Sequence, residues 1–288
     1  MKKMFAAVVA GLTMIPLLCS VTSAEDTGMT FALTAEQNYF FESDLREAGK
    51  TVHGQFWIRN YQPCTAIRTI LKSAEPLEIV NGQFTQPYFF HDCFFRAYTQ
   101  YSPVFDMPNI IVWNGPADDD YNIEPMRVVT PEGSFAEFDI NIPQNTPAGV
   151  YELSFRNGEY RESDGNTIPD TYAQNDMTEL SVAFESCNIV IEPDSLRGDV
   201  DCNGVVDSLD AKYALEYEVA YNRTKLKKTN EALSETFHTP YIHTGEKAAD
   251  ADLNGKLDSR DALAILKYHT LKLAHLPQEW SQIFPDEK

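Results

Sequence analysis

The chain has 288 residues, a formal net charge of -20 and only 5 cysteines. So acidic a protein is unsuited to nucleic acid or to an anionic membrane surface, but it suits divalent cations. Neither a CxxC pair nor Cys and His at a spacing typical of zinc occurs, and the length fits one large or two ordinary domains.

Residues 1–24 have the features of a secretory signal peptide. Two lysines precede an apolar run that ends at Leu18, and small residues follow up to Ala24. The run is too short for a membrane span, and Cys19 follows a leucine where a lipoprotein would have a small residue. We therefore expect a secreted, extracellular protein whose mature chain has about 264 residues.

Residues 25–193 show the period of β-strands. Apolar residues alternate with polar ones most clearly over 52–58, 138–142 and 151–155, and turn formers such as Gly, Pro and Asn separate the runs. Short alternating runs of this kind predict an antiparallel β-sandwich, and about 165 residues suit a jelly roll of eight or nine strands.

After residue 193 the period becomes helical, so residues 194–288 are predicted to form a second, small α-helical module. The linker is very short, and we expect the two modules to touch. The apolar positions that fit a helical face are Leu209, Ala211, Ala214, Leu215 and Val219, then Ala262, Leu263, Ile265, Leu266 and Leu273.

Four cysteines remain after removal of the signal peptide: Cys64, Cys93, Cys187 and Cys202. An exported chain can form disulfides, and Cys64–Cys93 is one candidate pair. Four cysteines allow three complete pairings, and free buried thiols are an equal alternative. The sequence leaves this question open.

Two segments of the helical region are copies of each other. Residues 199–210 and 250–261 are identical at seven of twelve positions, including every position with a ligand-type side chain. A calcium loop of twelve residues supplies oxygens from positions 1, 3, 5, 7, 9 and 12, with Gly at position 6 for the turn. The predicted ligands are Asp199, Asp201, Asn203, the carbonyl of Val205, Asp207 and Asp210, then Asp250, Asp252, Asn254, the carbonyl of Lys256, Asp258 and Asp261.

This pattern predicts two bound calcium ions, because each loop concentrates four carboxylates that would repel one another without a cation. Two features depart from an ordinary EF-hand. Position 12 is Asp rather than the longer Glu, and the residues before Asp199 and Asp250 are too short or too broken for an entering helix. Each unit is therefore predicted to be a half EF-hand, a loop followed by an exit helix.

The duplicated half EF-hand over residues 199–276 resembles the dockerins of cellulosomes, the fibre-degrading assemblies of anaerobic bacteria. The resemblance implies structural calcium and docking onto a cohesin of a scaffolding protein in a cell-surface complex. It also implies contact through loop positions 10 and 11 and the following helix faces. The corresponding residues here are Ser208, Leu209, Lys212, Ser259, Arg260 and Lys267.

Two departures from that family stand out. The copies start 51 residues apart, from Asp199 to Asp250, and we interpret residues 221–247 as an inserted loop. Leu209 and Arg260 occupy equivalent positions but differ in chemistry, so the two faces need not bind a partner interchangeably.

The sandwich weakly resembles a cohesin, through segments 49–52, 138–143, 148–153 and 187–191. A cohesin joined to a dockerin implies a non-catalytic adaptor scaffoldin. Such a protein binds a scaffold cohesin through its own dockerin and receives another dockerin on its sandwich.

Alternative functions for the sandwich are a carbohydrate-binding module and a small polysaccharide-active enzyme. Neither Gly-x-Ser-x-Gly nor HExxH occurs; residues 118–120 fit a solvated acidic turn, and Glu137 and Asp139 serve as surface acids as readily as catalytic ones. A sugar-binding strip would draw on Trp57, Tyr88, Phe89, Phe90, Phe94, Phe95, Tyr98, Tyr101 and Trp113, for most of which core packing is the competing interpretation.

Overall fold

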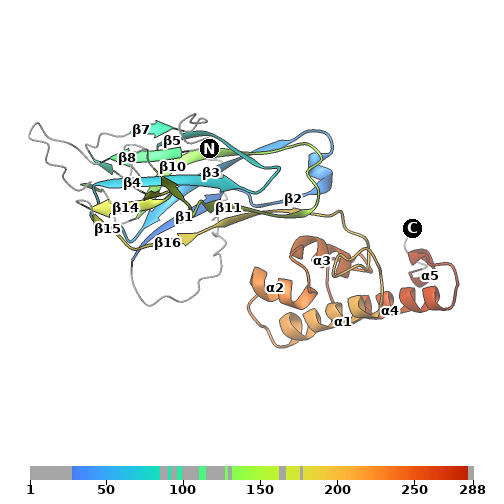
Figure 1. Ribbon diagram of the computed structural model, residues 1–288. Coiled ribbons are helices and arrows are strands. Elements are labelled where there is room, and N and C mark those ends of the chain that lie inside the picture. Colours follow the sequence, from blue (N-terminus) through green and yellow to red (C-terminus); the bar gives the residue numbers. More distant parts are fainter. Residues whose placement is uncertain are drawn as a thin grey trace, which may run out of the picture.

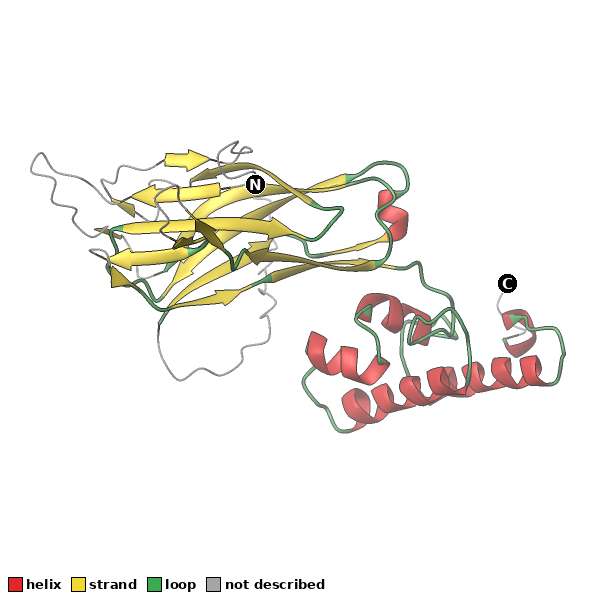
Figure 2. Ribbon diagram, in the orientation of Figure 1, coloured by secondary structure: helices red, strands yellow, loops and turns green. Residues whose placement is uncertain are grey.

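The computed structural model describes residues 28–84, 90–91, 96–98, 110–114, 127–128, 132–161, 167–175 and 178–284. In these residues a β-sandwich is followed by a helical module, which lies beyond one end of the sandwich (Figure 1, Figure 2). The predicted signal peptide lies outside the described residues. Within them, no helix combines the length and the apolar character that crossing a bilayer requires.

The first sheet of the sandwich has five strands, in the order β16-β1-β3-β10-β5. Their bounds are Met29–Ala35 for β1, Lys50–Arg59 for β3, Glu78–Phe84 for β5, Gly133–Ile142 for β10 and Val182–Glu185 for β16. The long alternating runs of the sequence form its centre, since β3 pairs with both β1 and β10.

The second sheet has eight strands, with β15-β14-β4-β11-β17-β2 as its main path; β8 also pairs with β4, and β7 pairs with β8. Their bounds are Tyr39–Phe41 for β2, Ala66–Ser73 for β4, Arg96–Tyr98 for β7, Ile110–Asn114 for β8, Gly149–Phe155 for β11, Tyr172–Asn175 for β14, Thr178–Glu179 for β15 and Cys187–Glu192 for β17. Smaller elements are β6 (Phe90–His91) with β9 (Arg127–Val128), β12 (Glu159–Arg161) with β13 (Thr167–Pro169), and the 3-10 helix η1 (Glu42–Leu45).

The prediction of a purely antiparallel sandwich is wrong at two strand pairs. β1 pairs in parallel with β16, and β2 pairs in parallel with β17. The first two strands of the sandwich thus run beside the last two in the same direction, with one such pair in each sheet. Parallel neighbours need a long connection, which the rest of the sandwich supplies.

Alternate residues of the strands fill the sandwich core. Phe56 is fully buried and lies 5.1 Å, ring centre to ring centre, from both Phe31 and Phe135 in edge-to-face geometry. Gly54 precedes it on the same face, where a Cβ would lie 2.4 Å from the Phe138 ring, so only glycine fits. The period-two pattern thus gives each strand an inner face whose side chains pack closely against those of the neighbouring strands.

We expect Phe56→Ala to lower the free energy of unfolding of the sandwich by about 3–5 kcal/mol, because it leaves a cavity among several aromatic rings. Urea unfolding followed by tryptophan fluorescence measures the change. The matched control is Val150→Ala, which removes an apolar side chain that is 46% exposed. An equal effect of the two substitutions would contradict the assigned core.

The helical module contains α1 (Ser208–Tyr217), the π-helix η2 (Glu218–Arg223), α2 (Asn230–Phe237), α3 (Ile242–Ala249), α4 (Ser259–Leu273) and α5 (Trp280–Ile283). Two predictions are therefore wrong. Residues 221–247 are mostly helical rather than an inserted loop, and α3 enters the second acidic loop directly. The Thr229 side chain caps α2, whose Leu233 and Phe237 are buried in the core of the module.

The buried faces of α1 and α4 contain only some of the apolar residues that fit a helical face in the sequence. The two helices lie side by side (Figure 1), and their buried residues in the module core include small and aromatic ones such as Ala211, Tyr213 and Ala214. Leu215 and Leu266 fit the apolar helix faces of the sequence, but they are 43% and 44% exposed. Small residues allow two helices to approach closely, and the larger leucines then remain on the outer side. The residues of these apolar faces that are exposed are Leu209, Leu215, Val219, Leu263, Leu266 and Leu273.

Candidate metal centres

Both acidic loops gather carboxylates at one point. Atoms of Asp199, Asp201 and Asp210 all lie within 4.8 Å of one another. The equivalent residues of the second loop, at positions 1, 3 and 12, form a matching group: Asp250, Asp252 and Asp261. Among the described residues, these are the two groups of His, Cys, Asp or Glu with a geometry suited to a metal ion.

The backbone of each loop is wrapped around its first aspartate. The Asp199 carboxylate accepts hydrogen bonds from the amides of Asn203 at 3.1 Å and Gly204 at 2.9 Å. In the second loop Asp250 accepts the same two bonds, at the same two distances. Gly204 makes the turn with φ of +86°, a left-handed conformation that favours glycine.

The last aspartate of each loop closes it. The Asp210 side chain is fully buried and accepts hydrogen bonds from the backbone amides of Val200 and Asp207, each at 2.7 Å. Asp207 in turn caps α1 by accepting from the amide of Leu209 at 2.7 Å. Position 12 therefore ties the start of the loop to the start of the helix that follows it.

The second loop repeats this closure with its own residues. Asp261 accepts from the amides of Asp252 at 3.0 Å and Asp258 at 2.9 Å, and Asp258 caps α4 through the amide of Arg260. Such a pairing of side chains and amides is a capping box. Loop closure and helix initiation thus depend on the same two aspartates.

Burial disfavours the ionised form of these carboxylates unless a positive charge lies nearby. Desolvation raises the pKa of Asp210 to about 6, and it also raises the pKa of Asp199 and of Asp261 above the ordinary range. Each of them also feels the negative charge of neighbouring aspartates. A divalent cation between the carboxylates would remove both penalties, so the donor set fits a hard cation that prefers oxygen ligands.

The remaining predicted ligands lie in the same loops but outside the two carboxylate groups. Asn203 and Asn254 are exposed, and their side-chain oxygens accept from the amides of Val205 and Lys256, each at 2.8 Å. One oxygen of Asp207, and likewise of Asp258, is engaged in capping a helix. The predicted ligands at positions 1, 3 and 12 are thus brought together.

The two loops differ at position 11. The Arg260 side chain donates to the Asp258 carboxylate at 3.0 Å, and this hydrogen bonding lowers the pKa of Asp258. Its counterpart in the first loop is Leu209, which leaves Asp207 without this ion pair. At position 4 of the first loop, burial raises the pKa of the Cys202 thiol to about 12, so the thiol stays protonated.

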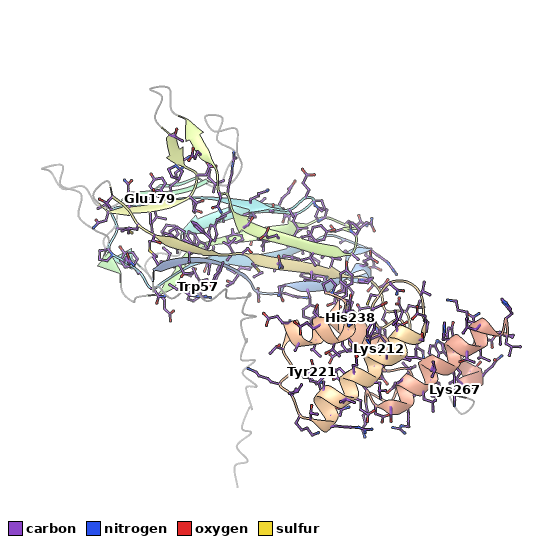
Figure 3. All side chains as sticks on the ribbon, turned by 60° about the horizontal axis from the view of Figure 1, so that its bottom comes forward. Trp57, Glu179, Lys212, Tyr221, His238 and Lys267 are labelled. Carbon is purple, nitrogen blue, oxygen red and sulfur yellow. The ribbon has the colours of Figure 1, made fainter. Side chains whose placement is uncertain are left out.

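The residues predicted to contact a partner lie outside the module core. Ser208 and Leu209 begin α1, Ser259 and Arg260 begin α4, and all four are exposed. Figure 3 labels the exposed Lys212 and Lys267 on the same two helices. The leucines missed by the sequence analysis add apolar area to this outer surface. We call the outer face of α1, of the start of η2 and of α4 the helix-pair face, made of Ser208, Leu209, Lys212, Leu215, Val219, Ser259, Arg260, Leu263, Leu266 and Lys267.

Where the structure describes the sandwich, it shows a polar sheet face and no group of metal-ligand side chains. His53 lies between Glu137 and Asp139, with nitrogen-to-oxygen distances of 3.9 Å and 3.7 Å. Both acids also accept side-chain hydrogen bonds, from Gln55 and Asn81 respectively.

The other candidates on the sandwich fall largely outside the described residues. Residues 118–120 and Cys93 lie there, as do Tyr88, Phe89, Phe94, Phe95 and Tyr101. The side chains of Phe90, Tyr98 and Trp113 lie outside the description as well, whereas Trp57 is half-buried and donates to Gln55 at 2.9 Å.

Comparison with known proteins gives similarities at the level of solved structures. No family model and no curated protein matches the chain. It is similar to the third ScaB cohesin of R. flavefaciens in complex with a group 1 dockerin, at 15% identity and a TM-score of 0.38, over 59% of this chain and 98% of that one. A non-cellulosomal cohesin of Archaeoglobus fulgidus has 16% identity and a TM-score of 0.32, over 57% of this chain and 91% of that one. A type III cohesin of the cell-surface anchoring scaffoldin of Ruminococcus flavefaciens has 10% identity and a TM-score of 0.35, over 62% of this chain and 97% of that one.

Proposed function

We propose that this protein is a secreted, non-catalytic adaptor of a cellulosome-type assembly. Its helical module is a calcium-dependent dockerin that binds a cohesin of a scaffolding protein. Its sandwich is a cohesin-like module that receives the dockerin of another protein. The observation that carries the proposal is the repetition, in two loops of one module, of the same carboxylate group and the same helix cap.

The calcium part of the proposal rests on that repetition. Asp210 and Asp261 are fully buried acids, and each has two further carboxylates within 4.8 Å. Buried charges are costly unless they are paired or bind a metal. When bound, calcium would supply the positive charge that lets each loop close around ionised ligands, held by the residues at positions 1, 3, 5, 7, 9 and 12.

The docking part rests on the helix-pair face. Apolar and basic side chains alternate on it, as Leu215 and Lys212 do on α1 and Leu266 and Lys267 on α4. Leu215 and Leu266 occupy equivalent positions in the two copies. Monomeric proteins seldom expose large apolar groups together without a partner to cover them. A face with this chemistry suits a protein surface that is apolar at its centre and acidic at its rim.

The sandwich part rests on the sequence resemblance and on the shape of the module. Two sheets pack into a closed core around Phe56, so recognition falls to a sheet face rather than to an interior cavity. One sheet face is enough for a protein partner, since interfaces of ordinary size bury about 800 Å² per partner.

The two binding activities can be tested separately in the full chain. We expect immobilised protein carrying Leu215→Asp and Leu266→Asp, which blocks the helix-pair face, still to capture at least one member of a panel of purified dockerins. We also expect it to wash off cellulose and xylan. Retention on either polysaccharide without capture of any dockerin would reject the adaptor function and favour a carbohydrate-binding module.

A further inference from the structure

The two modules are joined by a buried carboxylate. Glu192 ends β17, and its side chain is 1% exposed. It accepts hydrogen bonds from the backbone amides of His243 at 3.4 Å and Thr244 at 2.6 Å, and it lies 2.6 Å from Nδ1 of the His243 ring. A side chain of the sandwich therefore occupies the amino end of α3, where helix amides have no partner within the helix and negative charge is favoured.

Further contacts surround this carboxylate on both sides. The ring of Tyr39 on β2 stacks on His243 with centres 3.8 Å apart and planes 16° from parallel. The Thr244 hydroxyl donates to the carbonyl of Pro193 at 2.8 Å, and Arg46 pairs with Asp194. Every one of these contacts crosses from the sandwich or the linker to α3, or ties the linker to the sandwich.

The same helix also supports the second acidic loop. α3 ends at Ala249, and Asp250 is the first ligand position. The amide of Gly198, just before the first loop, donates to the carbonyl of Ala248 at 2.8 Å. A Cβ at Gly245 would lie 2.9 Å from the carbonyl oxygen of Val200, so α3 packs closely on the first loop. One helix thus touches the sandwich at its start and both loops along its length.

We propose that α3, which leads directly into the second loop, acts as a bracket that locks the helical module onto the sandwich through Glu192. The bracket makes the two modules one rigid body. It also links their orientation to the second loop, because α3 positions Asp250. The link to calcium rests on the proposed function, whereas the rigid orientation does not.

Nuclear spin relaxation of backbone amides in the full chain tests the bracket. In the unmodified protein, amides of both modules should report one rotational correlation time. In Glu192→Ala, and in Tyr39→Ala, the helical module should tumble faster than the sandwich. Tyr39 is 38% exposed, so its replacement removes the stack on His243 without disturbing either core. The matched control is Glu185→Gln, which weakens the ion pair with Arg59 on the sandwich and should leave a single correlation time.

A calcium titration in an Asp210→Asn background, where only the second loop is complete, tests the link. We expect Tyr39→Ala to weaken binding at that loop at least tenfold and Glu185→Gln to leave it unchanged. Two independent correlation times in the unmodified chain, or one shared time in both junction variants, would overturn the bracket. If the unmodified chain binds no calcium, the proposed function fails, and the relaxation measurement still decides the orientation.

Discussion

Removal of calcium from the intact chain is expected to unfold the helical module while the sandwich stays folded. The core of this module contains many alanines, and alanine buries little apolar area on folding. Asp210 and Asp261 would remain buried beside other carboxylates, and their helix caps depend on closed loops. At a free calcium concentration a thousandfold above Kd, each site contributes about 4 kcal/mol to the free energy of unfolding.

Circular dichroism at 222 nm in chelator, with and without added calcium, measures this loss of helix. The double variant Asp210→Asn, Asp261→Asn should behave like the chelated protein even with calcium present. The matched control is Glu231→Gln, an exposed acid of the same module that lies on α2 outside both loops. Full helicity in chelator would show that the loops are stable without a cation, against the proposed calcium sites.

Replacement of Ser208, Leu209, Ser259 and Arg260 together should abolish binding to the cohesin partner. All four side chains are exposed at the starts of α1 and α4, and none supplies a predicted ligand. Anchors at the centre of an interface are each worth about 2 kcal/mol or more, so we expect affinity to fall at least a hundredfold. Calorimetry against a cohesin panel measures the affinity, and a calcium titration should stay unchanged.

A second variant tests the part of the helix-pair face that the sequence analysis missed. Leu215→Asp with Leu266→Asp should weaken cohesin binding as strongly as the fourfold replacement does. Helicity should stay normal because both side chains lie outside the core. The control is Leu226→Asp, which places the same charge on a side chain that is 61% exposed in the loop before α2. Loss of helicity in the double variant would show that these leucines contribute to the core. Unchanged cohesin binding would show that they lie outside the interface.

The acidic loops could be located from the sequence because their chemistry is local. The shape of each loop is determined within twelve consecutive residues. The spacing of Asp199, Asp201 and Asp210 in the sequence is therefore enough to predict that their carboxylates come together. The central strands were predictable for a similar reason. The residues that alternate from Val52 to Ile58 are those whose side chains enter the core.

Features that depend on contacts between distant residues could not be predicted from the sequence. α3 contains Gly245 and Thr244, neither of them a strong helix former, and its start is capped by Glu192 from about fifty residues earlier. Leu215 fits an apolar helix face in the sequence but is 43% exposed, whereas Ala211, Tyr213 and Ala214 of the same helix are buried in the module core. The parallel pairing of β1 with β16 joins residues more than a hundred positions apart, and no local pattern encodes it.

The short connection between the modules has a mechanical consequence. From Glu192 to Asp199 the chain has seven steps, or roughly 25 Å when fully extended, and contacts with α3 hold much of it in place. A chain with a long flexible spacer first straightens under tension and absorbs the pull. Here a force applied between the sandwich and the helical module reaches the buried Glu192 almost at once. That carboxylate should therefore be the first internal contact to break when the two ends of the protein are drawn apart.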